Sequence, residues 1–120
     1  MSRILAVDDS ASMRNLVRTT LTAAGFELVL ATDGENALAA ARAAHSDLVL
    51  ADLNMPNMDG MALIRALRAE EAYRHIPILM LTTESSKEAK MEGKAAGATG
   101  WIVKPFDPKL LLRTLQRVLE

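Results

Sequence analysis

Polar and charged side chains stand directly after four of the apolar stretches in this sequence. They are Asp8, Asp9, Asp52, Thr82 and Lys104. If the stretches are parallel strands of one sheet, their carboxyl ends meet at the same edge, where open α/β sheets bind ligands. We therefore expect a cleft that contains three carboxylates, one hydroxyl and one ammonium group.

Three carboxylates in one cleft repel each other, at a cost on the order of 4 kcal/mol per pair at ~4 Å and an effective dielectric of ~20. Raised pKa values or a bound cation would relieve this repulsion. A few carboxylate oxygens suit Mg²⁺, which keeps several waters and commonly gains a phosphate ligand. A carboxylate can also attack phosphorus and form an acyl phosphate. Asp52 is the candidate nucleophile, and Thr82 and Lys104 can neutralise charge during phosphoryl transfer.

Short apolar runs alternate with helical patterns along the whole chain. The runs cover residues 4–7, 27–31, 48–51, 78–81 and 101–103. Their nearly continuous hydrophobicity is typical of strands buried on both faces of a parallel sheet. Five strand–helix units predict an α/β fold, a doubly wound parallel sheet with five helices.

Capping residues and apolar spacing predict where the helices lie. Ser10 or Ser12 can begin a helix that ends before Gly25, with Met13, Leu16, Val17 and Leu21 facing inward. Residues 35–44 and 87–96 read as helices, and Asp59 can cap a third. Asp107 and Pro108 can open the last one. Thr32 and Asp33, after the second run, read as an ordinary loop.

The composition limits the class of protein. A length of 120 residues and 13.0 kDa fits one domain. The net charge of −1 provides no basic field for nucleic acid or for an acidic membrane. No cysteine is present, so disulfides and thiolate metal sites are excluded. No apolar stretch is long enough to span a bilayer or form a signal peptide. We expect a soluble, monomeric, cytoplasmic protein.

Each candidate residue also has a structural explanation when it is taken alone. Asp8 and Asp9 can complement the N-terminus of the first helix, and Asp52 can cap its loop. Thr82 is a common residue at a strand end, and Lys104 can be a solvated surface lysine. The functional interpretation depends on all of these polar residues falling at the same end of successive strands.

Four motifs, in this order and spacing, resemble the receiver domain of two-component response regulators. They are "AVDDS", "LADLNMPNMDG", "MLTTES" and "VKPF". "DDSASMRNLV" is most similar to the single-domain chemotaxis group typified by CheY. The resemblance covers essentially the whole chain. It implies the flavodoxin-like strand order 2-1-3-4-5, for which CheY is itself a standard example.

The resemblance implies a role for each matching position. Asp52 matches the aspartate that accepts a phosphoryl group from a histidine kinase. Asp8 and Asp9 match the acidic pair that holds Mg²⁺, and Asn54 matches the residue whose carbonyl completes the metal site. Thr82 and Lys104 match the hydroxyl and the ammonium group that contact the phosphoryl group.

The resemblance also implies a switch. Trp101 falls at the aromatic position that moves inward when Thr82 moves, although Tyr or Phe is commoner there. Thr83 stands where a small residue is usual, and its extra bulk would restrict access of water or a phosphatase to the acyl phosphate. The bond between Lys104 and Pro105 is expected to be cis, a geometry plausible only before proline.

The output is expected to be a protein contact. Because the sequence stops after the fifth helix, we expect one receiver domain over residues 1–120 without an output domain. The expected docking surface carries Lys87, Lys90, Lys94 and Trp101. The resemblance implies a CheA-like histidine kinase as phosphodonor and the flagellar motor switch as target. A phosphate sink or a phosphorelay intermediate would carry the same motifs.

Other classes of protein fit the sequence less well. A haloacid-dehalogenase-type phosphatase needs a second acid two residues after its nucleophile, where this chain has Asn54. A flavodoxin-like electron carrier must bind phosphate in its first strand–helix loop, and Asp8 and Asp9 would repel it. Neither GxxxxGK[ST] nor GxGxxG occurs, which argues against a nucleotide-binding module. A basic patch for DNA is also missing. We expect a phosphoacceptor that assists its own phosphorylation and dephosphorylation and is not an enzyme.

Overall fold

The computed structural model is a single five-stranded parallel sheet with helices on both faces, and it describes residues 2–53, 55, 58–83 and 86–119. The strand order is β2-β1-β3-β4-β5, so the predicted fold class is confirmed. The elements in chain order are β1 (Arg3–Val7), α1 (Ala11–Ala23), β2 (Glu27–Ala31), α2 (Gly34–Ala43), β3 (Leu48–Asp52), α3 (Gly60–Ala69), the 3₁₀ turn η1 (Glu71–Tyr73), β4 (Ile78–Thr82), α4 (Lys87–Ala96), β5 (Gly100–Val103) and α5 (Pro108–Leu119).

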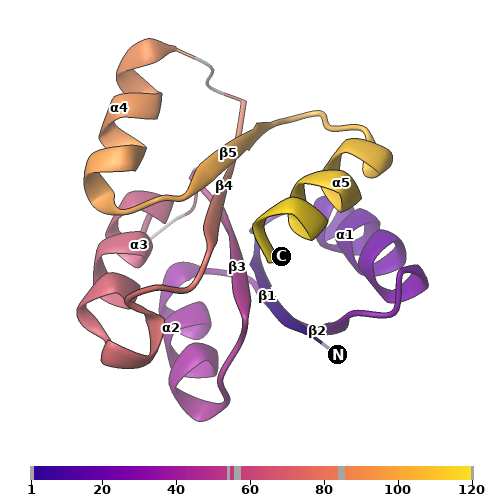
Figure 1. The fold of residues 1–120 in the computed structure, drawn as a ribbon, viewed down its shortest axis with the longest axis horizontal. Helices are drawn as coiled ribbons and strands as arrows, with labels where there is room; N and C mark the ends of the chain where they lie inside the picture. Colours follow the sequence, from indigo (N-terminus) through magenta and orange to yellow (C-terminus); the bar gives the residue numbers. More distant parts are fainter. Residues whose placement is uncertain (1, 54, 56–57, 84–85, 120) are drawn as a thin grey trace.

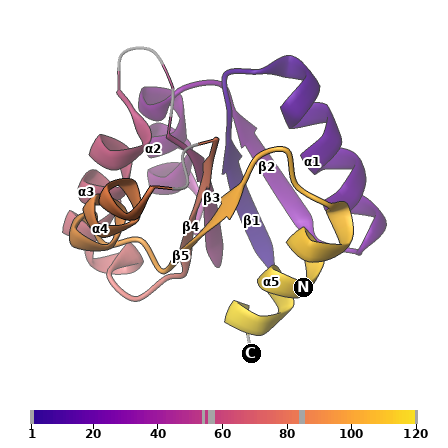
Figure 2. The same ribbon diagram turned by 90° about the horizontal axis from the view of Figure 1, so that it is seen from above.

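Two hydrophobic layers hold the helices to the sheet. Helices α2, α3 and α4 pack on one face, and α1 and α5 pack on the other (Figures 1 and 2). Side chains of β3 alternate between the two layers: Val49 and Ala51 belong to the first, and Leu48 and Leu50 to the second. The central strands are therefore fixed from both sides, which makes their carboxyl ends rigid supports.

The outer strands are less buried than the sequence predicts. Every residue of β3 and β4 is buried, whereas β2 and β5 are the edge strands and are partly exposed. Burial on both faces was therefore the wrong expectation for these two. An edge strand has a neighbour on one side only, and the apolar runs alone do not reveal which strands are at the edge.

Local capping explains where the helices begin and end. Ser10, Asp59 and Ser86 each accept a hydrogen bond from a backbone N–H in the first turn of the helix that follows. Asp33, predicted as ordinary loop, does the same for α2. Helix α4 ends at Ala96 and is followed by Gly97, whose φ of 114° lies in the left-handed region that favours glycine.

One predicted helix face is partly wrong. Val17 and Leu21 of α1 are buried, but Leu16 is 38% exposed. Residues four apart lie above one another on a helix, whereas neighbouring residues point about 100° apart. Because Val17 and Leu21 define the line that faces the sheet, Leu16 turns toward solvent.

Gly60 sets the position of α3 against the end of β3. A Cβ added at this buried residue would collide with the carbonyl oxygen of Asp52 and lie 2.7 Å from Cα of Leu53. Both atoms are backbone, so they can move only if the strand or the helix moves. The first turn of α3 can therefore approach the strand end only because residue 60 has no side chain.

We predict that Gly60→Ala lowers the free energy of unfolding by about 1–3 kcal/mol, the usual cost of overpacking. Urea denaturation measures it. The control is Gly100→Ala, whose Cβ would lie 3.3 Å from a methyl carbon at the end of the Leu79 side chain and meet no backbone atom within 4 Å, and its change should be within about 0.5 kcal/mol. Helix propensity alone favours alanine by about 0.5–1 kcal/mol. A Gly60→Ala protein more stable than wild type would therefore contradict this packing account.

Candidate functional site

Adjacent parallel strands place two buried carboxylates side by side. The register pairs Val7 of β1 with Ala51 of β3, so Asp8 and Asp52 follow at the same level. Asp52 is 1% exposed and Asp8 is 2% exposed. Burial of a charged group is costly unless other groups compensate it, so the surroundings of these two carboxylates decide what the site can do.

The third carboxylate completes an acidic cluster. Oxygen atoms of Asp8, Asp9 and Asp52 all lie within 4.8 Å of one another. Asp9 is exposed, so the cluster opens to solvent on its side. At this separation each pair repels by about 3 kcal/mol at an effective dielectric of ~20. An all-oxygen group of this kind is suited to a hard divalent cation such as Mg²⁺.

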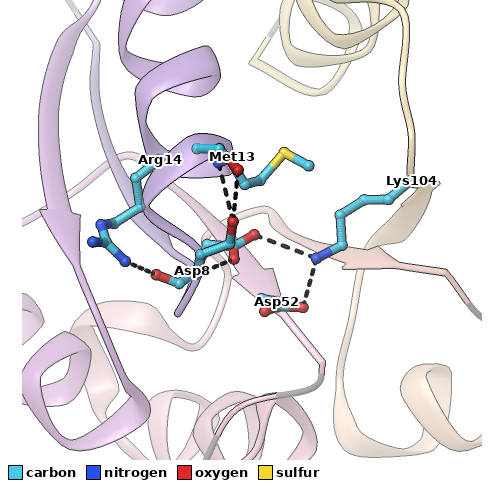
Figure 3. Close-up of polar contacts among 7 residues, drawn as sticks. Asp8, Met13, Arg14, Asp52 and Lys104 are labelled. Atoms are coloured by element: carbon cyan, nitrogen blue, oxygen red, sulfur yellow. Dashed lines mark hydrogen bonds and ion pairs between the residues drawn. The ribbon is translucent and has the colours of Figure 1, made fainter.

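Lys104 joins the two buried carboxylates. Its Nζ lies 3.0 Å from Oδ1 of Asp52 and 3.3 Å from Oδ2 of Asp8, and its side chain is 13% exposed (Figure 3). Burial by itself lowers the pKa of Lys104. The hydrogen bond and charge of Asp52 and those of Asp8 outweigh this effect, so the pKa is raised. The lysine is therefore a fixed positive charge inside the acidic cluster.

The first turn of α1 holds Asp8 in position. Oδ1 of Asp8 accepts a hydrogen bond of 2.9 Å from the backbone N–H of Ser10, which leaves Oδ2 directed at Lys104. Ser10 in turn caps α1 by accepting from the N–H of Met13. The guanidinium of Arg14 donates to the carbonyl oxygen of Asp8 at 2.8 Å (Figure 3). Sequence reasoning missed Arg14, because a lysine or arginine six residues after an aspartate has no distinctive pattern.

Thr82 and Lys104 are linked through the backbone. Thr82 is the last residue of β4 and is 1% exposed, and its carbonyl accepts a hydrogen bond of 2.7 Å from the N–H of Lys104. The next peptide bond, Lys104–Pro105, is cis, as the resemblance implied. Thr83 is exposed. A groove of about 400 Å³ begins at Thr82 and Thr83 and runs between α3 and α4.

Trp101 and the three predicted lysines are not part of the acidic cluster. Trp101 is on β5 and is 39% exposed. Lys87, Lys90 and Lys94 are on α4, and the Nζ of Lys90 lies 5.0 Å from the centre of the Trp101 ring. Asn54 lies outside the described residues. None of the helices among the residues that the structure describes is long and apolar enough to cross a membrane.

A comparison of the sequence with protein families identifies the class of protein that has this fold and this acidic cluster. Residues 4–116 match the model of the response regulator receiver domain, so the chain belongs to this family of two-component signalling proteins.

Within the family, the similar proteins include chemotaxis regulators. The chain is 37% identical over 119 residues to the chemotaxis protein CheY of Pseudomonas aeruginosa, covering 98% of this chain and 96% of that protein. It is 40% identical over 119 residues to CheY-3 of Vibrio cholerae, covering 98% and 92%. The chain is thus a CheY-like receiver domain.

Solved structures agree with this fold. The chemotaxis response regulator CheY4 of Vibrio cholerae superposes with a TM-score of 0.95 at 55% identity, covering 98% of each chain. The receiver domain of a sensor histidine kinase from Pseudomonas aeruginosa superposes with a TM-score of 0.91 at 30% identity, covering 98% of this chain and 97% of that one. That receiver domain has a magnesium ion coordinated in its active-site cleft.

We predict that Lys104→Met destabilises the protein in the presence of a chelator by on the order of 3 kcal/mol, because two buried carboxylates lose their ion pair. Urea denaturation measures this loss. Lys109→Met is the matched control, since Lys109 is an exposed lysine on α5, and its effect should stay within about 0.5 kcal/mol. Equal stabilities of the two variants would show that Lys104 does not compensate the acidic cluster.

Proposed function

We propose that this protein is a phosphorylation-activated signalling switch that accepts a phosphoryl group on Asp52 from a histidine kinase. One observation carries the proposal. The Asp52 carboxylate sits at the end of a buried strand, with Asp8 and Asp9 oxygens within 4.8 Å and the Lys104 ammonium 3.0 Å away. A carboxylate placed in this way is held rigidly as a nucleophile, with charge of both signs beside it.

The acidic cluster fits one Mg²⁺ ion. Asp8, Asp9 and Asp52 would provide carboxylate oxygens, and the carbonyl of Asn54, outside the described residues, is the proposed fourth ligand. When bound, the ion supplies charge neutralisation for the phosphoryl oxygens and for the carboxylates themselves. The support for this assignment is the close approach of three carboxylates, which is unfavourable without a cation.

The proposed reaction transfers a phosphoryl group between two side chains. An oxygen of Asp52 attacks phosphorus, a phosphorus–oxygen bond forms, and the bond from phosphorus to the kinase histidine nitrogen breaks. Lys104 neutralises charge on the phosphoryl oxygens, and the Thr82 hydroxyl donates a hydrogen bond to one of them. Hydrolysis of the acyl phosphate, assisted by the same residues, resets the protein. The chain is a phosphoacceptor in this scheme and not an enzyme.

Activation is a shift between two populations of the same chain. New contacts of Thr82 and Lys104 with the phosphoryl group favour the active state, and Trp101 moves inward in that state. A change from 1:99 to 99:1 takes about 5.5 kcal/mol. Two charge-assisted hydrogen bonds at about 1.5–3 kcal/mol each cover much of this, so a partial shift is expected.

The output surface is proposed to comprise α4, β5 and α5. It combines the ammonium groups of Lys87, Lys90 and Lys94 with the half-exposed ring of Trp101. Because similar proteins are named as chemotaxis proteins, we assign a CheA-like kinase as phosphodonor and the flagellar motor switch as target. A phosphate sink or relay intermediate is the second candidate function.

The protein would act as a cytoplasmic monomer, a single receiver domain over residues 1–120. The side chain of Thr83 would restrict the access of a phosphatase to the acyl phosphate.

A phosphodonor assay tests the acceptor. Acetyl phosphate with Mg²⁺ should label wild-type protein, and either Asp52→Asn or removal of Mg²⁺ by a chelator should reduce labelling at least tenfold. Asp33→Asn is the matched control, because Asp33 also follows a strand and asparagine caps a helix equally well. Its labelling should equal that of wild type. Wild-type labelling of the Asp52→Asn protein would refute the assignment.

A binding assay separates the motor target from the phosphate sink. Phosphorylated wild-type protein should bind the purified motor switch protein from the same organism at least tenfold more tightly than the unphosphorylated protein does. The phosphorylation-dependent gain should be lost in Asp52→Asn. Equal and weak binding in both states, together with rapid acceptance of phosphate from the kinase, would favour the sink or relay instead.

A further inference from the structure

A lysine lies over the only tryptophan of the chain. The Nζ of Lys90, on α4, is 5.0 Å from the centre of the Trp101 ring, on β5. An ammonium group within about 6 Å of an indole ring is attracted to its negative face. The ring is 39% exposed, and Lys90 is half-buried. The contact therefore joins α4 to the outward position of the indole.

The register of β4 and β5 places this contact next to Thr82. Ile102 packs in the layer under α1 and α5, so its neighbour Trp101 lies on the opposite face of the sheet, toward α4. Trp101 pairs with Met80, and Val103 pairs with Thr82. Trp101 and Thr82 are thus diagonal neighbours on the same face of the sheet. A movement of Thr82 changes the space beside the indole ring.

The neighbouring lysines of α4 do not share this contact. Lys87 and Lys94 lie about one turn before and after Lys90 on the same side of the helix. Both are exposed, and in the described part of the chain the Lys90–Trp101 contact is the one cation–π pair. Lys90 therefore shares its charge and its helix with the other two lysines but differs from them in its contact with Trp101 and in its burial.

We propose that Lys90 is a positioning residue that holds Trp101 in the resting, outward arrangement and so sets the threshold of the switch. This inference rests on the proposed function, because it takes the inward movement of Trp101 as the active state. Turning the indole inward removes the ring from the ammonium group that α4 carries. Because the attraction is lost in the active state, it opposes activation. A variant that lacks the Lys90 ammonium group should therefore populate the active state more.

The expected size follows from the strength of exposed cation–π contacts. About 0.5–1 kcal/mol corresponds to a two- to fivefold change in the equilibrium between the two states. When the active state is a minor population, a change in its population changes the apparent affinity of a ligand that binds only this state by the same factor. Lys90→Met should therefore bind a phosphoryl mimic about two- to fivefold more tightly than wild type.

The test is a titration of metal-saturated protein with beryllofluoride, an anionic phosphoryl mimic, followed by Trp101 emission. The midpoint is compared between wild type, Lys90→Met and Lys90→Arg. Arginine keeps the cation over the ring, so Lys90→Arg should keep the wild-type midpoint. Because the midpoint does not depend on the size of the emission change, altered quenching by the new side chain does not affect it.

Lys87→Met and Lys94→Met separate this effect from a simple loss of charge. Removal of a positive charge weakens binding of an anion, so both controls should have unchanged or slightly higher midpoints. A Lys90→Met midpoint that equals theirs, or exceeds that of wild type, would overturn the proposal. The proposed switch fails separately if wild type binds the mimic in a calorimeter without any change in Trp101 emission, and the role of Lys90 then falls with it.

Discussion

Three carboxylates that repel one another, those of Asp8, Asp9 and Asp52, lie together at one edge of the sheet. Two of them, Asp8 and Asp52, are almost fully buried, so solvent does not screen them. The protein brings Lys104 between them on the segment that follows β5. It also fixes Asp8 through Ser10 and the first turn of α1. The cluster therefore remains assembled but retains an excess of negative charge, which a divalent cation can neutralise.

The fold provides the rigidity that this arrangement needs. β3 and β4 are buried on both faces, and the helix starts at Ser10, Asp59 and Ser86 lie at the same edge of the sheet as the cluster. Gly60 lets α3 begin directly against the Asp52 carbonyl. Lys104 is attached to β4 through the Thr82 carbonyl. The end of the sheet that holds the acidic cluster is thus tied to its most buried strands, whereas β5 and α4, which carry the proposed output surface, are partly exposed.

Much of this architecture can be predicted from the sequence, because apolar runs and caps are local signals. The edge where Asp52, Thr82 and Lys104 meet follows from the rule for parallel strands. Burial of β2 and β5 was mispredicted because that expectation came from the apolar runs alone, which do not show that these strands lie at the edges of the sheet. The ion pairs of Lys104, the support from Arg14 and the Lys90–Trp101 contact depend on side-chain conformations across distant segments. No spacing in the chain encodes those contacts.

In the proposed metal site, Asp8, Asp9 and Asp52 share one cation. A calorimetric titration of the wild-type protein and of Asp9→Asn with Mg²⁺ tests it most directly, because Asp9 is exposed and its substitution leaves the buried ion pairs of Lys104 in place. We expect one Mg²⁺ per wild-type chain and at least tenfold weaker binding by Asp9→Asn. Equal affinity and stoichiometry in the two proteins would show that Asp9 does not share the cation.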